Sequence, residues 1–191
     1  TYFMSQDTQI ADKIFDFASE GDPGRSIETD RVLATILFND IVGSTEMQAK
    51  LGDTAWRRKI ENFDELCRSS IQLYSGNYVK SLGDGILAIF SGPTRAINCA
   101  LHIKEESRKL DLEVRSGLHV GEIERIRDDV SGINVNAASR IQAAAGANQV
   151  LVSEVLKSLS FGSNITFNDL GDFNLKGFDG KWRLAEVSNT D

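Results

Sequence analysis

The sequence has few of the residues that build disulfide-rich or metal-rich proteins, since its 191 residues include only two cysteines and two histidines. Cys67 and Cys99 lack the spacing of a disulfide framework or a zinc site, so we expect a reduced chain in the cytoplasm. His102 and His119 are too few for a typical histidine metal centre. The composition also shows no bias toward a collagen, a coiled coil or a repeat array.

Long apolar runs and an excess of basic residues are missing as well. The longest apolar stretches, 32–38 and 86–90, are too short to cross a bilayer, and no basic segment followed by an apolar run marks a signal peptide. The chain has 21 basic and 28 acidic residues, a net charge of −7. This balance disfavours binding to nucleic acid through its phosphates. We therefore expect neither a membrane span nor a nucleic-acid partner.

The chain is long enough, and with 41% hydrophobic residues apolar enough, to form one domain with a substantial core. We interpret residues 1–30 as a leader and linker from an upstream regulatory domain, residues 31–187 as the main domain, and residues 188–191 as a tail. Residues 1–3 precede the first methionine, and we take them to be foreign to the natural chain.

The leader has its own pattern, in which four apolar residues are spaced as one face of a short helix before a glycine- and proline-containing break at 21–26. These residues are Ile10, Ile14, Phe15 and Phe17. A helix that packs on its own domain is an equally good interpretation of the same pattern.

The main domain begins with an apolar run at 32–38, which predicts a strand buried on both faces. A helix is expected to start at Ser44–Thr45, where Thr45 and Gln48 have the spacing of a capping box. Further strands are predicted at 77–82, 85–90, 150–152, 167–170, 173–175 and 182–187, and residues 113–124 are predicted to form either one long strand or a pair of strands. Further helices are predicted at 54–74, 93–110, 134–145 and 154–159. This order predicts an α+β fold with a ferredoxin-like βαββαβ core and additional C-terminal strands and helix.

Asp40 lies where the first strand ends, just before a glycine turn and the start of a helix. Free backbone N–H groups at a helix N-terminus favour phosphate, and a neighbouring carboxylate can hold the Mg²⁺ that accompanies phosphate. From this segment alone, an Asp that merely ends a strand is an equally good interpretation.

Asp84 lies in a Gly-Asp-Gly turn between two apolar runs, and such a turn by itself usually indicates only a hairpin. Together with Asp40, however, it places two carboxylates at one sheet edge. Two carboxylates can bridge a pair of divalent ions, which act on the attacking and leaving oxygens of a phosphoryl displacement.

Asn136 and Arg140 are four residues apart on a predicted helix and so share one face. An amide beside a guanidinium suits a ribose or a phosphate, although from this pattern alone a solvated polar face is the better interpretation. Lys176 lies between a late predicted strand and a turn, and this position alone indicates no function.

Four motifs in this order resemble the catalytic domain of class III nucleotidyl cyclases, in the bacterial adenylate cyclase branch. They are Phe38-x-Asp40-Ile41-Val42-Gly43-x-Thr45, Lys80-x-x-Gly83-Asp84, Asp129-x-x-Gly132-x-x-Val135-Asn136-x-Ala138-Ser139-Arg140 and Leu175-Lys176-Gly177. The resemblance extends over residues 31–187. It implies an adenylate cyclase catalytic domain that converts ATP to 3′,5′-cyclic AMP and pyrophosphate.

The resemblance also implies a role for each matching residue. Two divalent cations, Mg²⁺ with Mn²⁺ able to substitute, are expected on Asp40, Asp84 and the backbone of Ile41. The backbone at Val42, Gly43, Ser44 and Thr45 is expected to hold the triphosphate, which Lys176 also reaches. Arg140 is expected to stabilise charge that develops on the α-phosphate, and Asn136 to orient the ribose.

Lys80 and Asp129 match the residues that select the purine. Lys80 can only donate hydrogen bonds and ionised Asp129 can only accept them, which complements N1 and N6 of adenine and opposes guanine. A buried mismatch of this kind can discriminate by roughly 10⁴. Guanylate-forming relatives carry Glu and a small residue here, so ATP is the expected substrate. Asp128 is a neighbouring alternative to Asp129, and only the count back from Gly132 favours the second.

By the same resemblance, two subunits are expected to associate head to tail as a homodimer with active sites between them. One subunit supplies the metal-binding aspartates and the other supplies the purine-selecting, asparagine and arginine groups. A cyclase-like domain without turnover and a guanylate cyclase are the alternative interpretations.

Overall fold

The computed structural model describes residues 30–188. The expected apolar face of the leader, at Ile10, Ile14, Phe15 and Phe17, lies outside the described residues, as does most of the expected tail. The division of the chain into leader, main domain and tail therefore stays a prediction.

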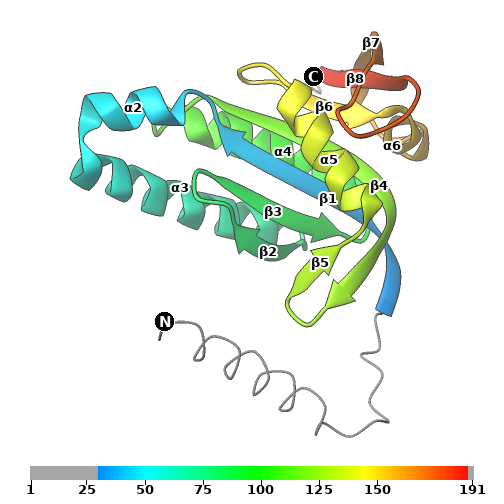
Figure 1. The fold of residues 1–191 in the computed structure, drawn as a ribbon, viewed down its shortest axis with the longest axis horizontal. Coiled ribbons are helices and arrows are strands. Elements are labelled where there is room, and N and C mark those ends of the chain that lie inside the picture. Colours follow the sequence, from blue (N-terminus) through cyan, green and yellow to red (C-terminus); the bar gives the residue numbers. More distant parts are fainter. Residues whose placement is uncertain (1–29, 189–191) are drawn as a thin grey trace, which may run out of the picture. The chain divides into compact units, whose positions relative to one another are not determined.

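The main domain is built on an eight-stranded sheet with the order β2-β3-β1-β4-β6-β8-β7, and β5 pairs with β4 beside this path (Figure 1). The strands are β1 (Asp30–Ile41), β2 (Asn77–Ser81), β3 (Gly85–Phe90), β4 (Val114–Ile126), β5 (Asp129–Ser131), β6 (Val150–Ser153), β7 (Thr166–Phe173) and β8 (Trp182–Ser188). The helices are α2 (Ser44–Leu51), α3 (Asp53–Leu73), α4 (Pro93–Arg108), α5 (Ile133–Ala144) and α6 (Glu154–Leu159).

The expected ferredoxin-like core is confirmed. Strands β1 to β4 lie in the order β2-β3-β1-β4, with α2 and α3 between β1 and β2, and α4 between β3 and β4. β1 runs antiparallel to β3, and β2 antiparallel to β3. The remaining strands and α6 extend the sheet beyond β4, as the α+β prediction with additional C-terminal elements requires.

The sheet is covered on both faces, which explains the apolar run of β1. Leu37 packs with Phe63 of α3 and Ile97 of α4, whereas the adjacent Ile36 packs with Ala138 of α5. Because successive strand residues point to opposite faces, α5 lies on the face opposite α3 and α4. Figure 1 shows this arrangement, with α5 in front of β4.

Two glycines of β4 allow α5 to lie very close to the strand. A Cβ on Gly117 would be 2.0 Å from the backbone nitrogen of Gln142, and a Cβ on Gly121 would be 2.3 Å from the side chain of Asn134. Neither position can hold a larger residue without moving α5 or Asn134. The position of α5 is therefore fixed by the absence of side chains on β4 as well as by apolar burial.

Two local predictions were wrong. The N-cap of α2 is Gly43, with φ 67°, and no side chain caps the helix. Thr45 is already inside α2, and the Gln48 amide donates to Asp53 instead. Residues 167–170 and Phe173 belong to one continuous strand, β7, with an irregularity between Asp169 and Gly171, whereas residues 174–175 follow the end of this strand.

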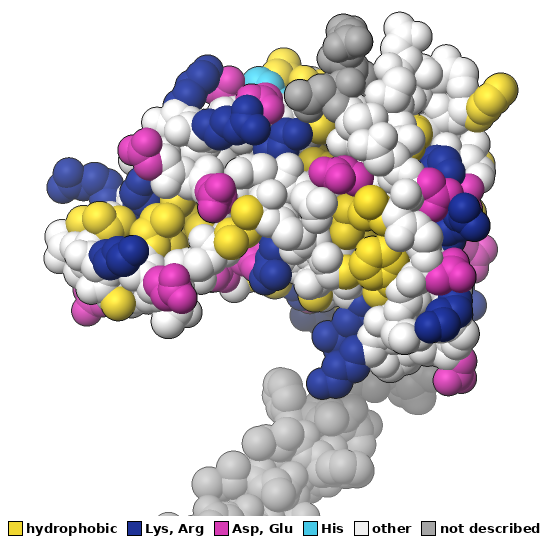
Figure 2. Space-filling view, turned by 90° about the horizontal axis from the view of Figure 1, so that it is seen from above, with side chains coloured by type: hydrophobic (Ala, Val, Ile, Leu, Met, Phe, Trp, Pro, Cys, Tyr) yellow, Lys and Arg dark blue, Asp and Glu magenta, His cyan; other side chains and the backbone are white. Residues whose placement is uncertain are grey.

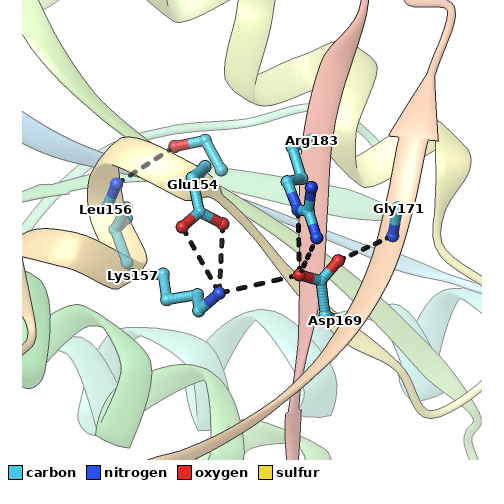
Figure 3. A network of polar contacts seen from close by, with 7 residues as sticks. Glu154, Leu156, Lys157, Asp169, Gly171 and Arg183 are labelled. Atoms are coloured by element: carbon cyan, nitrogen blue, oxygen red, sulfur yellow. Dashed lines mark hydrogen bonds and ion pairs between the residues drawn. The ribbon is translucent and has the colours of Figure 1, made fainter.

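A polar network joins α6 to the two C-terminal strands (Figure 3). Asp169 of β7 accepts hydrogen bonds from the Arg183 guanidinium at 2.7 and 2.8 Å and from the Gly171 amide at 2.8 Å. Lys157 of α6 lies 3.9 Å from Asp169 and 3.1 Å from Glu154. Since these groups are partly or fully exposed, we assign the network to positioning the β7–β8 pair rather than to a large stabilisation.

Charged side chains of both signs are interspersed over the face shown in Figure 2 and form no continuous basic surface there. Within the described part of the chain, no helix is long and apolar enough to cross a membrane.

Candidate active site

Asp40 and Asp84 come together because β1 and β3 are neighbours. The Ile41 amide donates to the Asp84 carbonyl at 3.0 Å, and Asp40 is the register partner of Gly85. A Cβ on Gly85 would lie 3.2 Å from Oδ1 of Asp40 and 2.5 Å from the carbonyl oxygen of Asn39. Glycine at this position thus lets the Asp40 carboxylate lie directly against the turn that carries Asp84.

One oxygen of Asp40 is held by two residues that the sequence did not indicate. Its Oδ2 accepts a hydrogen bond from Arg115 Nη2 at 2.9 Å and a longer one from Gln142 Nε2 at 3.3 Å. Burial raises the pKa of Asp40, the hydrogen bond from Arg115 opposes this, and the negative charge of Asp84 raises the pKa further. An added cation would therefore relieve charge repulsion between the two aspartates.

The loop after Asp40 connects to Asp84 through Ser44, whose hydroxyl donates a hydrogen bond to Oδ2 of Asp84. The Ile41 and Val42 amides donate to the carbonyls of Asp84 and Glu113, so they are not free for a phosphate. The first backbone hydrogen bond of α2 runs from Met47 to Gly43. Because the first N–H groups of a helix have no intrahelical acceptor, the open amides of this loop are those of residues 43–45.

A cavity of about 590 Å³ adjoins these groups. It is lined by Ser44 and Thr45 of α2, by Trp56 and Arg57 of α3, and by Asp84. Arg57 is the one basic residue of this lining, which also includes the acidic side chains of Asp53, Glu61 and Asp84. A negatively charged group bound here would therefore depend on the open amides and on cations held by the carboxylates.

The donor atoms fit a magnesium ion that binds together with a nucleotide. Among residues 30–188 no cluster of three or more His, Cys, Asp or Glu side chains could hold a metal alone. Mg²⁺ commonly uses one or two carboxylates and completes its coordination with substrate phosphates and water. Asp40 and Asp84 provide those two carboxylates, and the backbone of Ile41 stays a predicted further ligand.

Lys80 and Asp129 meet across β2 and β5. Lys80 Nζ lies 2.6 Å from Oδ2 and 2.8 Å from Oδ1 of Asp129. The hydrogen bond from Lys80 lowers the pKa of Asp129, as does a second hydrogen bond from the Val130 amide. The neighbouring Asp128 makes no such contact, so the structure pairs Lys80 with Asp129. A purely accepting group and a purely donating group are thus presented side by side.

Asn136, Arg140 and Lys176 are exposed, and within the described residues 30–188 their side chains make no hydrogen bond or ion pair. Asn136 and Arg140 lie on α5, and Lys176 lies between β7 and β8. Arg140 and Gln142 are two residues apart, so on a helix their side chains point about 200° apart. Since Gln142 faces Asp40 of its own chain, Arg140 points away from that carboxylate.

Arg115 and Gln142 could not have been found from a local pattern. Arg115 is one polar residue within the long strand β4, and Gln142 follows Arg140 on a helix of small residues. Their contact with Asp40 depends on the order of the strands and on the close packing of α5. The tertiary structure was needed to assign them.

The βαββαβ core places two carboxylates at one sheet edge, next to open amides at the start of a helix, and also forms a Lys–Asp pair. These features suit a domain that binds a nucleotide together with a divalent cation. Residues 28–187 match the family model "Adenylate and Guanylate cyclase catalytic domain". Because this match extends over most of the chain, the protein belongs to that family and contains a nucleotidyl cyclase domain.

Named relatives agree with this assignment, and a solved structure agrees with the fold. The chain is 30% identical over 125 residues to an adenylate cyclase of Streptomyces coelicolor, covering 64% of this chain and 32% of the relative. It is 27% identical over 160 residues to a putative adenylate cyclase of Rhizobium meliloti, covering 78% and 27%. Its fold resembles the adenylyl cyclase CyaB from P. aeruginosa, with a TM-score of 0.81, 24% identity and coverage of 86% and 97%.

The chain spans 39% or less of the length of the curated relatives named here and of similar uncharacterized mycobacterial proteins. Activities and partners of the whole relatives therefore do not transfer directly to this chain.

Proposed function

We propose that this domain is an adenylate cyclase that converts ATP to 3′,5′-cyclic AMP and pyrophosphate. The observation that carries the substrate assignment is the pair formed by Lys80 and Asp129, because a donor beside an acceptor complements adenine and opposes guanine. The adjacent carboxylates of Asp40 and Asp84 support the reaction class, since they suit divalent cations that accompany a triphosphate.

In the proposed reaction the ribose 3′-oxygen attacks the α-phosphorus in line with the departing pyrophosphate, and the hydroxyl proton leaves to solvent. Divalent cations, when bound, neutralise phosphate charge and make the 3′-hydroxyl more acidic. Asp40 and Asp84 hold those cations, and the open amides of residues 43–45 bind phosphate oxygens. Arg140 stabilises the charge that develops on the α-phosphate, Asn136 orients the ribose, and Lys176 binds the triphosphate.

We further propose that each active site is shared by two chains arranged head to tail in a homodimer. The support is geometric: Gln142 faces Asp40 of its own chain, so Asn136 and Arg140 point away from it. A site that needs Asp40, Asn136 and Arg140 together is consequently completed by a second copy.

Incubation of the chain with ATP or GTP and Mg²⁺ or Mn²⁺, followed by chromatography of the products, tests the reaction. We expect cyclic AMP from ATP, with much less cyclic GMP from GTP. No cyclic product under any of these conditions would indicate a domain without turnover, and faster turnover of GTP would identify a guanylate cyclase.

Mixing two inactive variants tests the shared site. Asp40→Ala and Arg140→Ala should each be inactive, whereas mixed dimers should regain part of the activity because one of their two sites has both residues. Mixed dimers that form and yet remain inactive would refute the shared arrangement. Differently tagged chains allow the mixed dimer to be isolated before the assay.

A further inference from the structure

We propose that His119 is a positioning residue that holds α5 and the β7–β8 loop, and thereby orients the groups that α5 and this loop contribute to the neighbouring chain's active site. The inference rests on the proposed function, because Asn136, Arg140 and Lys176 are the groups to be oriented. The partners of the His119 ring are Ser153, Asn134 and Trp182, and not the aspartates Asp40 and Asp84. It lies within β4, on the strand against which α5 packs.

The ring of His119 is buried and hydrogen-bonded on both sides. Nε2 lies 3.1 Å from Oδ1 of Asn134, and Nδ1 lies 2.8 Å from the hydroxyl of Ser153. Asn134 Nδ2 donates to the carbonyl of Glu122 at 2.8 Å, which assigns Oδ1 as the acceptor for His119. His119 therefore carries its proton on Nε2 and accepts from Ser153 at Nδ1.

These hydrogen bonds form one directed chain between secondary-structure elements. The Leu156 amide of α6 donates to Ser153, Ser153 donates to His119, and His119 donates to Asn134 in the first turn of α5. Burial lowers the pKa of His119, so the ring is neutral near pH 7 and the chain of donors and acceptors is complete. Each buried polar group in it has a partner, so loss of one leaves its neighbour unsatisfied.

Asn134 is held in place by shape as well as by hydrogen bonds. Its side chain fills the space above Gly121, where a Cβ would lie 2.3 Å from its Cγ. Asn134 is two residues before Asn136 on the same helix. Displacement of Asn134 therefore moves the start of the helix that presents Asn136 and Arg140.

A second contact links His119 to the loop that carries Lys176. The His119 and Trp182 rings have centroids 5.4 Å apart in an edge-to-face arrangement, and Trp182 packs in the same way on Phe178 at 5.2 Å. Lys176 lies between Leu175, which is buried, and Phe178, which is partly buried. His119 thus stands between the two segments that supply the proposed substrate groups.

Two substitutions of His119 separate its hydrogen bond from its ring. His119→Phe keeps a ring against Trp182 but loses the bond to Asn134, and we expect kcat to fall about tenfold or more while KM for ATP changes less than about threefold. His119→Gln can place an amide donor near the position of Nε2, and we expect it to retain most of kcat. Equal losses in both variants, or an unchanged kcat in His119→Phe, would overturn the proposal.

Asn134→Ala provides a second test if His119→Phe folds poorly, because Asn134 is only partly buried and its truncation removes the same hydrogen bond. We expect the same loss in kcat as in His119→Phe. The double variant should lose less than the sum of the two single losses, since both single variants remove the hydrogen bond between His119 and Asn134. Additive losses would show that the two residues act independently and would overturn the proposal.

The mixed dimer shows which half of the site His119 serves. In a dimer of Asp40→Ala and Arg140→Ala chains, the Asp40→Ala chain supplies α5 and Lys176 to the single complete site. His119→Phe in that chain should lower the activity about tenfold or more, whereas the same substitution in the Arg140→Ala chain should lower it much less, because it disturbs the start of α5 and not Gln142 near its end. Equal losses from either chain would indicate a general effect on folding and would contradict the inference.

Hydrogen–deuterium exchange keeps this inference separable from the shared-site proposal. In His119→Phe we expect faster amide exchange in residues 133–140 and 174–182, with α3 and α4 unchanged. If the mixed dimer without His119 substitutions is inactive, the shared-site proposal fails while exchange still decides the role of His119. Unchanged exchange in both segments would refute that role.

Discussion

At the scale of single residues, Lys80 and Asp129 form an ion pair and also offer complementary hydrogen-bonding groups to a base. The two side chains form an ion pair at 2.6 Å, yet both are substantially exposed, so the pair contributes little to stability. Their value lies in what each can offer to a base, a donor from Lys80 and an acceptor from Asp129.

Exchanging the two charges should shift the purine preference toward guanine without removing the ion pair. In the double variant Lys80→Glu with Asp129→Lys, the acceptor and donor trade places and match N1–H and O6 of guanine. We expect the ratio of kcat/KM for ATP to that for GTP to fall by about 10² or more. Steady-state assays with both nucleotides measure this ratio, and thermal unfolding serves as the control for folding. An unchanged ratio in a folded variant would refute the role of Lys80 and Asp129 in purine selection.

His119 also predicts how stability depends on pH. Its pKa in the folded chain lies below the ordinary value of 6.5 because it is buried, so the unfolded chain binds the proton more readily. The free energy of unfolding should therefore fall as pH decreases through about 6.5, with a slope of at most about 1.4 kcal/mol per pH unit from this group.

Urea unfolding at pH 7.5 and 5.5 measures this dependence. The loss of stability between these pH values should be smaller in His119→Phe than in the original chain, because the variant has no group to protonate at this position. The comparison cancels the contributions of other titrating groups. An equal loss in both proteins would show that His119 does not contribute.

The two cysteines predict a further chemical property of the folded chain. Both are fully buried, and burial raises the pKa of Cys99 to about 12 and that of Cys67 well above its usual value. Since the thiolate is the reactive form, neither should react with a thiol reagent in the native protein at pH 8. Both should react after unfolding in denaturant. Rapid labelling of the native chain would contradict this burial.

At the scale of secondary-structure elements, the contact between β4 and α5 controls the site. α5 presents Gln142 to Asp40 on one side and exposes Arg140 on the other, so its distance from β4 affects both halves of the proposed site. That distance is set at Gly117, where a Cβ would be 2.0 Å from the Gln142 backbone nitrogen.

Gly117→Ala should therefore displace α5. We expect a loss of stability of about 1–3 kcal/mol from overpacking, together with a loss of activity larger than the unfolded fraction explains. Gly92→Ala is the matched control, because a Cβ there meets no atom within 4 Å and its φ is −157°. We expect the control to change stability by less than about 1 kcal/mol. Chemical unfolding and initial rates measure both effects.

Much of the fold could be predicted because its signals are local. The apolar run of β1, the Gly-Asp-Gly turn and the small residues of α5 each show in adjacent positions of the sequence. The capping prediction at Thr45 was wrong because the glycine turn starts α2 earlier and the Ser44 hydroxyl is used on Asp84.

The residues that hold the site's side chains in place were less predictable than the motifs that contain the site residues. Arg115 and Gln142 act on Asp40 from 75 and 102 residues away along the chain, and no local spacing links them. The same holds for His119 and Ser153, which meet only because β4 and β6 are parallel neighbours. Residues proposed to touch a ligand can lie in a motif of nearby positions. The residues that hold those side chains in place are brought to them only by the order of the strands in the sheet.

At the scale of the whole molecule, the proposed homodimer makes the number of complete sites depend on which chains associate. Two unaltered chains form two sites, so each chain accounts for one. When an unaltered chain pairs with an Asp40→Ala chain, the site that combines its own Asp40 with the partner's Arg140 remains complete. Activity per unaltered chain should then stay the same.

A chain that carries both Asp40→Ala and Arg140→Ala should behave differently from either single variant. Paired with an unaltered chain, it damages both sites, because each needs one residue from each chain. A large excess of the double variant should therefore abolish the activity of a fixed amount of unaltered chain, whereas an excess of Asp40→Ala should not. Initial rates during the two titrations, with dimer formation followed by sedimentation, measure this difference. Absence of inhibition by either variant would place Asp40 and Arg140 of one chain in the same site.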